Sequence, residues 1–203
     1  MDKIDYKKKL SDFYQAKIDK PIVVQVPKMN FIMIDGKGDP NKSKEYQDAM
    51  QVLFTLSYTL KFMIKKGKEE IDYHVLPLEG LWWADDMNSF TSGDKDKWFW
   101  TMMIRQPDFI TAEHFKTALE NAKKKKPELD FSKVRFEKLT EGNSVQIMHI
   151  GPFTAEGPTI QKVHDKIASL GMKRSGKHHE IYLSDIRKAE PGKWKTVIRQ
   201  PIA

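Results

Sequence analysis

A stretch near the carboxyl end of the chain combines residues that could do chemistry. Side chains alternate across a β-strand, so His178, Glu180 and Tyr182 are expected on one face of it. His179 and Ile181 would then point the other way, into a core. A carboxylate on a mostly buried strand is costly unless a salt bridge, a hydrogen-bond network, a cationic ligand or a reaction uses its charge. The alternative is a solvated glutamate on an edge strand.

A second glutamate, Glu79, lies on another expected strand and could form an acid–base pair with Glu180. Two carboxylates in one apolar cleft perturb each other, and burial raises the pKa of at least one of them. We therefore expect one glutamate to take a proton from water, while the other, or Tyr182, donates a proton. A covalent ester on Glu180 is the less favoured variant.

A repeat in the sequence suggests how the two glutamates come together. Trp100–Pro107 and Trp194–Pro201 share Trp, Ile, Arg, Gln and Pro, each displaced by 94 positions (194 minus 100). This match predicts two related halves, at about 21–107 and 132–203, joined by a helix at about 108–127. Each half has an apolar face that it cannot bury alone. The halves should therefore meet around a pseudo-twofold axis, with a ligand cleft between them and Glu79 equivalent to Glu180.

The hydrophobic pattern predicts an α+β fold with a β-α-β-β order in each half, forming an antiparallel sheet. A helix from about Lys42 to Lys66 has apolar residues spaced by three and four, and Asp39 with Pro40 is expected to start it. The other predicted strands are 22–26, 30–35, 79–83, 98–105, 134–138, 144–150, 178–183 and 194–201; the other helices begin at Thr111 and near Pro158, the latter capped by Gly171.

Composition limits the classes of protein that the chain can belong to. With 203 residues, of which 39% are hydrophobic and 31% charged, it should form one globular domain, 1–203. It has no cysteine, signal peptide or spanning segment, so we expect a cytoplasmic protein without disulfides or membrane contact. The net charge of +7 comes largely from solvated lysine runs without a nucleic-acid-binding motif. Direct contact with nucleic acid is therefore not expected.

Other chemistries fit the residues less well. Six histidines suggest zinc, but neighbours such as His178 and His179 point apart on a strand and lack a zinc-protease spacing. The serines lack a nucleophile elbow, and no phosphate-binding glycine motif occurs. We therefore expect neither a metal nor a cofactor.

Aromatic residues suit a flat, apolar small-molecule partner. Trp82, Trp83 and Trp100 are candidate ligand-binding residues together with His178. For Trp100 a place in the core is an equally good interpretation, because it sits in the repeated strand.

The order of these motifs resembles the GyrI-like small-molecule-binding proteins in their stand-alone form. The resemblance rests on the strand Pro77–Trp83, the Ile-Arg-Gln-Pro strand ends, the turn His149–Pro152 and the closing stretch 178–183, and it spans about 23–201. It implies two fused β-α-β-β modules with Glu180 at the bottom of the cleft between them.

The resemblance also implies a function. In related multidrug-sensing transcription regulators the equivalent acid meets flat cationic drugs, whereas some stand-alone relatives hydrolyse cyclopropanoid DNA-alkylating natural products, which confers drug resistance. Here no DNA-binding domain precedes the module, which argues against a transcriptional role. We therefore expect binding of flat apolar or cationic molecules with cyclopropanoid hydrolysis by the cleft glutamates. The alternative is a non-catalytic sensor or sequestering protein.

Overall fold

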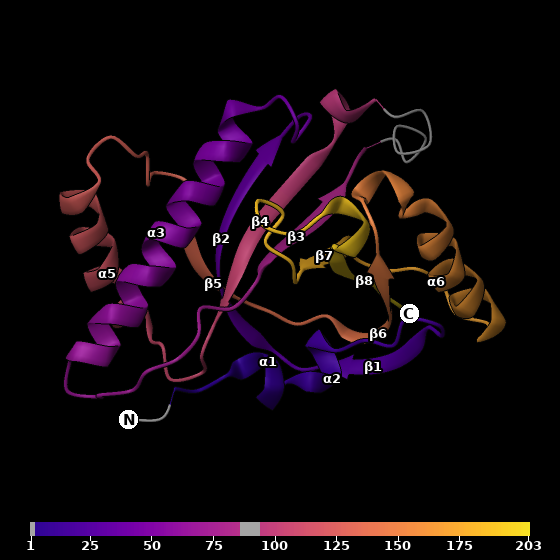
Figure 1. Ribbon diagram of the computed structural model, residues 1–203, viewed down its shortest axis with the longest axis horizontal. Helices are drawn as coiled ribbons and strands as arrows, with labels where there is room; N and C mark the ends of the chain where they lie inside the picture. The colour runs from indigo at the N-terminus through magenta and orange to yellow at the C-terminus, as the bar shows by residue number, and fades with distance from the viewer. Residues whose placement is uncertain (1–2, 86–93) are drawn as a thin grey trace. The chain divides into compact units, whose positions relative to one another are not determined.

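The computed structural model describes residues 3–85 and 94–203, which fall into two compact units (Figure 1). The first unit comprises Met1–Tyr6, Met29–Leu76 and Trp82–Leu139. The second comprises Lys7–Lys28, Pro77–Leu81 and Thr140–Ala203. Strand β3 (Leu78–Trp83) therefore contributes residues to both units.

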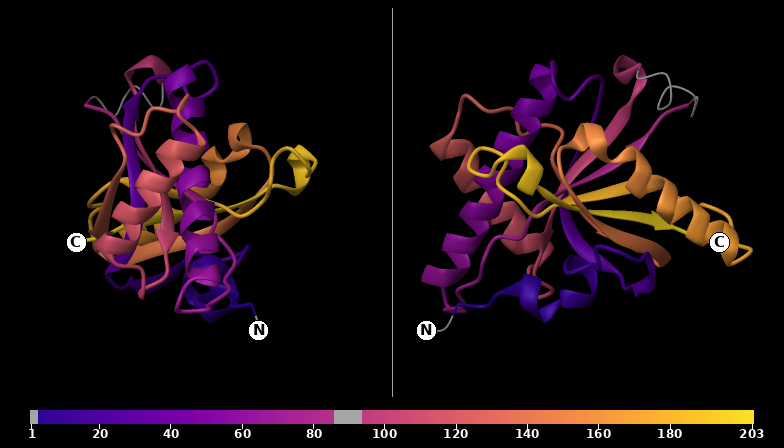
Figure 2. Two further views of the ribbon diagram at one scale, coloured as in Figure 1. Left: turned by 90° about the vertical axis from the view of Figure 1, so that its left-hand side faces the viewer. Right: turned by 45° about the vertical axis from the view of Figure 1, so that its right-hand side comes forward.

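The first unit is a sheet with two helices. Its other elements are β2 (Met29–Lys37), α3 (Lys44–Lys66), β4 (Phe99–Gln106), α5 (Ala112–Lys125) and β5 (Arg135–Leu139), with a 3-10 turn at Lys95–Lys97. The strand order is β3-β4-β2-β5, and β2 is antiparallel to both β4 and β5. Helices α3 and α5 pack side by side, as the views in Figure 2 also show.

Helix α3 forms where the apolar period predicts it, but it starts later than expected. The side chain of Ser43, not Asp39, is the N-cap and accepts a hydrogen bond from the backbone N–H of Tyr46 at 3.2 Å. Asp39 instead accepts from the backbone and side chain of Asn41 within the preceding turn. The expected Asp39 start is therefore wrong, because Asp39 stabilises the turn before the helix. The apolar stripe is buried as predicted, at Leu53, Leu56, Leu60 and Ile64.

The second unit is built around four further strands and one long helix. Its elements are β1 (Ile22–Val26), β6 (Gly142–Ile150), α6 (Gly157–Ser169), β7 (His178–Tyr182) and β8 (Lys195–Pro201), with short turns of helix α1 (Tyr6–Lys9), α2 (Ser11–Tyr14), Phe153–Ala155 and Pro191–Lys193. The strand order is β1-β6-β8-β7-β3. Helix α6 packs on β6 and β8 through a core of Val145, Ile147, Val163, Ile167 and Ile198. Gly171 follows α6 with a φ of 68°, which fits its predicted place at the helix end.

The two units follow the same order, β2-α3-β3-β4 and β6-α6-β7-β8. Their registers also correspond: Met33 lies opposite Met103, and Met148 lies opposite Val197. The α+β class with antiparallel strand pairing is confirmed. A common origin of the halves and a cleft between them stay predictions.

The compact units differ from the expected halves in where two strands, β1 and β5, pair. β1, which precedes β2 in the chain, pairs with β6, with Val24 opposite Ser144. β5, which precedes β6, pairs with β2, with Ile32 opposite Phe136. A strand joins the edge whose backbone groups and apolar face match its own, so proximity in sequence does not choose its partner.

Candidate functional site

The predicted alternation along β7 is observed. His179 and Ile181 are fully buried, whereas the side chain of Glu180 is 15% exposed. Each oxygen of this carboxylate meets one neighbour on the same face. His178 Nε2 lies 3.1 Å from Glu180 Oε1, and the hydroxyl of Tyr182 donates to Glu180 Oε2 at 2.8 Å. Glu180 is thus held in place by the residues two positions before and after it.

A second carboxylate that the sequence did not single out lies beside Glu180. Glu156, directly before α6, is 5% exposed and interacts with both Glu180 and Thr196. Burial, and then the negative charge of Glu180, raise the pKa of Glu156 to about 9. Burial would also raise the pKa of Glu180, but the hydrogen bonds from His178 and Tyr182 outweigh it and lower that pKa. At neutral pH the pair therefore holds one proton and one negative charge.

Aromatic rings adjoin this acid pair within the second unit. Phe153, in the 3-10 turn after β6, is exposed, and its ring lies edge-on to Tyr182 with centroids 5.5 Å apart. The same ring lies 5.0 Å from that of Trp194. In the sequence, the turn His149–Pro152 served as a motif of the family resemblance, and the residues that follow it were not singled out. The residues after that turn, Phe153 and Glu156, were the signal that was missed.

The other predicted acid, Glu79, has different partners. The hydroxyl of Tyr14 donates to Glu79 Oε1 at 2.7 Å, and His179 Nε2 lies 3.0 Å from Glu79 Oε2. Because His179 and Glu180 are adjacent on a strand, their side chains lie on opposite faces of it. The structure therefore joins Glu79 to His179 and does not bring Glu79 and Glu180 together. The carboxylate beside Glu180 is Glu156.

His179 is the centre of a buried charged network. Its Nδ1 lies 2.8 Å from Glu141 Oε1, and Arg199 donates to the other oxygen of Glu141 at 2.8 Å. Burial would lower the pKa of His179, but Glu141 and Glu79 raise it to about 9. Burial would raise the pKa of Glu141, but His179 and Arg199 hold it at about 2. Arg199 also donates to the carbonyl of Phe13, so the network fastens α2 to the strands.

The predicted aromatic residues at positions 82 and 83 lie in the first unit. Trp82 is buried and packs between Tyr46 and Trp98, with its ring centroid 6.1 Å from that of Tyr46 and 6.0 Å from that of Trp98. Trp83 is partly exposed and stacks on Phe99 at 5.7 Å. Trp83 is therefore the more accessible of the two.

Trp100 is a core residue. It has no exposed area, lies edge-on to Tyr46 at 5.2 Å, and covers Gly36 so closely that a Cβ there would come within 2.1 Å of the ring. A ligand could reach this side chain only if the core opened. The structure thus favours the core interpretation of Trp100 over the ligand-binding one.

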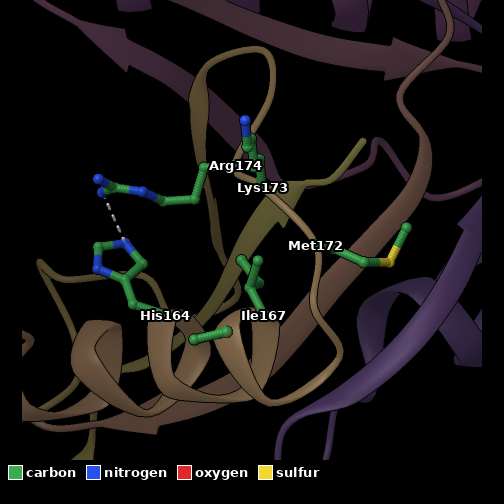
Figure 3. A pocket seen from close by; sticks show the side chains of 6 residues that line it. His164, Ile167, Met172, Lys173 and Arg174 are labelled. Atoms are coloured by element: carbon green, nitrogen blue, oxygen red, sulfur yellow. Dashed lines mark hydrogen bonds between the residues drawn. The ribbon is translucent and has the colours of Figure 1, made fainter.

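A hollow of about 380 Å³ lies at the end of α6, away from the predicted residues (Figure 3). It is lined by His164, Ile167, Ala168, Met172, Lys173 and Arg174. Arg174 and His164 hydrogen-bond across it at 3.4 Å. The hollow therefore presents basic and apolar groups and none of the candidate acids.

Within residues 3–85 and 94–203, no group of three or more His, Asp or Glu side chains is arranged to hold a metal ion. Over the same residues, no helix is both long and apolar enough to cross a membrane.

Solved structures of similar proteins come from Listeria innocua. An uncharacterized conserved protein is 45% identical, with 99% of this chain and 100% of that chain covered and a TM-score of 0.92. A hydrolase is 44% identical, with coverages of 99% and 100% and a TM-score of 0.86. Another hydrolase structure is 44% identical over the whole of both chains, with a TM-score of 0.88. No curated protein sequence matches the chain.

The family model that matches the chain describes a GyrI-like small-molecule-binding domain. The match covers residues 19–203, which includes every candidate residue discussed above. The chain therefore belongs to the GyrI-like family of small-molecule-binding domains.

Proposed function

We propose that the face of β7 around Glu180 binds flat apolar or cationic small molecules and hydrolyses cyclopropanoid DNA-alkylating compounds. The observation that carries this proposal is an ionised, partly exposed carboxylate that adjoins aromatic rings. Glu180 keeps its charge through His178 and Tyr182, and Phe153 lies against Tyr182. A cation gains from both the carboxylate and the faces of aromatic rings.

The same geometry supports a hydrolytic mechanism. Glu180 takes a proton from water, and the water oxygen forms a bond to a cyclopropane carbon conjugated to a dienone. The carbon–carbon bond breaks, and its electron pair moves to the carbonyl oxygen, which takes a proton from Tyr182. Because Tyr182 is hydrogen-bonded to Glu180, the proton from water can return along that bond and restore both groups. The 44% identity to hydrolases over the full chain supports this role.

Glu79 takes a different role in this proposal from the one expected. It contacts His179, whose charge helps to lower the pKa of Glu180. We assign Glu79 a positioning role through His179, since it lies on the other side of the strand.

The alternative is a protein that captures small molecules without reacting with them. The family match to a binding domain supports this alternative, since a charged acid beside aromatic rings suffices for binding.

A cyclopropanoid incubated with the pure protein distinguishes the two functions. Absorbance changes that continue over many equivalents of substrate would support the hydrolase. Quenching of tryptophan fluorescence that saturates at one equivalent, without product, would support the binding protein. If the protein forms no product and its tryptophan fluorescence is not quenched, the proposed function is overturned in both forms.

Trp83 is expected to contribute to ligand binding if a flat ligand stacks on it. Replacing Trp83 by alanine should then weaken binding by about 1–3 kcal/mol, as for a buried aromatic anchor. Titration of a flat aromatic cation, followed by calorimetry, measures the loss. Phe62→Ala is a control, because Phe62 is an exposed aromatic residue on α3. Unchanged affinity in both Trp82→Ala and Trp83→Ala would return these residues to a purely structural role.

A further inference from the structure

Glu156 is a buried acid without an obvious structural purpose. The residue is 5% exposed, and its Oε1 is shielded from solvent without a hydrogen-bond partner in the described part of the chain. The hydroxyl of Thr196 beside it is shielded too, and it interacts with Glu156 without meeting the geometry of a full hydrogen bond. A buried polar atom is normally paired, so an unpaired one beside a partly exposed carboxylate needs an explanation.

We propose that Glu156 sets the charge that this site offers to ligands: it keeps a proton while Glu180 carries the negative charge, and it releases that proton when a cationic ligand binds. The inference rests on the proposed function, because it requires that cations bind at Glu180. It adds a residue that determines which ligand charge the site prefers.

Different charged groups face each of the two acids. Glu180 faces His178 and Tyr182 on its own strand, senses the charge of His179, and meets Glu156 from the start of α6. Glu156 faces Glu180 and Thr196. Two close carboxylates in a shielded place cannot both ionise readily, and the raised pKa of Glu156, about 9, agrees with this geometry.

A bound cation changes this balance. Its positive charge near Glu180 offsets the repulsion between the two carboxylates and therefore lowers the pKa of Glu156. Glu156 then loses its proton, and the doubly charged pair holds the cation more tightly. A neutral ligand supplies no such charge and leaves the proton in place. Binding of cations, but not of neutral molecules, is thus linked to proton release.

Glutamine at position 156 gives a sharp test, because it has the shape of protonated glutamate but cannot ionise. Glu156→Gln should bind tetraphenylphosphonium, a cation without titratable groups, more weakly than the wild type at a pH of about 7, because it cannot supply the second negative charge. Between a pH of about 7 and 9, affinity of the wild type should rise more steeply, by up to about tenfold per pH unit. His179 titrates in both proteins, so the difference between their slopes isolates Glu156. Calorimetry in two buffers of different protonation enthalpy measures the released protons directly.

The pH dependence of tetraphenylphosphonium binding by the two proteins can contradict the inference in several ways. Equal slopes in the wild type and in Glu156→Gln would overturn the inference and leave cation binding intact. A folded Glu156→Gln protein that binds tetraphenylphosphonium as tightly as the wild type at neutral pH would also overturn it, because ionisation of Glu156 would then add nothing to cation binding. Absence of binding in the wild type would overturn the proposed cation binding along with the inference.

A measurement on the wild type keeps the inference testable if Glu156→Gln folds poorly. The infrared C=O stretch of a protonated carboxylic acid should be present at neutral pH. It should diminish when tetraphenylphosphonium is added, but not when neutral triphenylphosphine oxide is added. A C=O band that does not respond to the cation would contradict the proposal.

Discussion

Replacing Glu180 by glutamine is expected to lower cyclopropanoid turnover by roughly 10²- to 10⁴-fold, the usual contribution of a general base. Glutamine keeps the length of the side chain and can still bond to Tyr182, but it cannot take a proton from water. It also carries no charge, so cationic ligands should bind more weakly while neutral flat ligands bind as before. Single-turnover rates and binding titrations measure the two effects separately.

The same variant should remain folded, because Glu180 is partly exposed and its hydrogen bonds to His178 and Tyr182 lie within its own strand. Glu137→Gln is a matched control, since Glu137 is an exposed acid on β5. If Glu180→Gln lost thermal stability instead of activity, Glu180 would be a structural acid paired with His178. A stable variant with unchanged turnover and cation affinity would disprove the role of Glu180 and make Glu156, the carboxylate beside it, the next residue to test.

Replacing Glu141 by glutamine should destabilise the protein by about 3–5 kcal/mol, the usual cost of removing one partner from a buried ion pair. Glu141 accepts from both His179 and Arg199, and all three side chains are almost fully buried. The variant leaves Arg199 with a neutral partner and His179 with Glu79 alone. Denaturant-induced unfolding of both proteins gives the difference directly. Glu190→Gln, which breaks an exposed pair with Lys193, should change stability little.

This loss should depend on pH in a defined way. The pKa of Glu141 falls from an ordinary 4.5 to about 2 in the folded protein, so its contribution is present above 4.5 and lost as the pH falls towards 2. The pKa of His179 rises from an ordinary 6.5 to about 9, so its contribution is present below 6.5 and lost as the pH rises through 9. The difference between wild type and Glu141→Gln should thus be largest between 4.5 and 6.5. A difference that stays constant from a pH of about 2 to about 9 would show that the network contributes through packing alone.

Local patterns in the sequence were sufficient to predict most helices and strands and the residues that share one face of β7. Period-2 alternation placed Glu180 and Tyr182 together and His179 in the core, and the structure agrees. Spacing by three and four predicted α3 and its buried stripe. These predictions succeed because backbone geometry alone decides which side chains of one element share a face.

The error at Asp39 shows where local patterns stop. Both Asp39 and Ser43 carry an acceptor suited to an N-cap, and each is followed by residues that can begin a helix. Asp39 bonds to Asn41 instead, so the helix starts four residues later. Which of the two residues becomes the N-cap depends on how the preceding turn packs. Intrinsic helix propensities do not include that packing.

The sequence by itself thus determined the family, the order of strands and helices, and the face of β7 that carries Glu180. Only the tertiary structure decided that Glu156 lies beside Glu180, that Glu79 binds His179, and that β1 and β5 join strands remote in the chain. The physical reason is that a buried charge takes the partner that long-range packing brings within hydrogen-bond distance. Glu156 is 24 positions from Glu180 (180 minus 156), and no local period relates the two. Their meeting depends on where the start of α6 packs against the strands, which only the folded chain specifies.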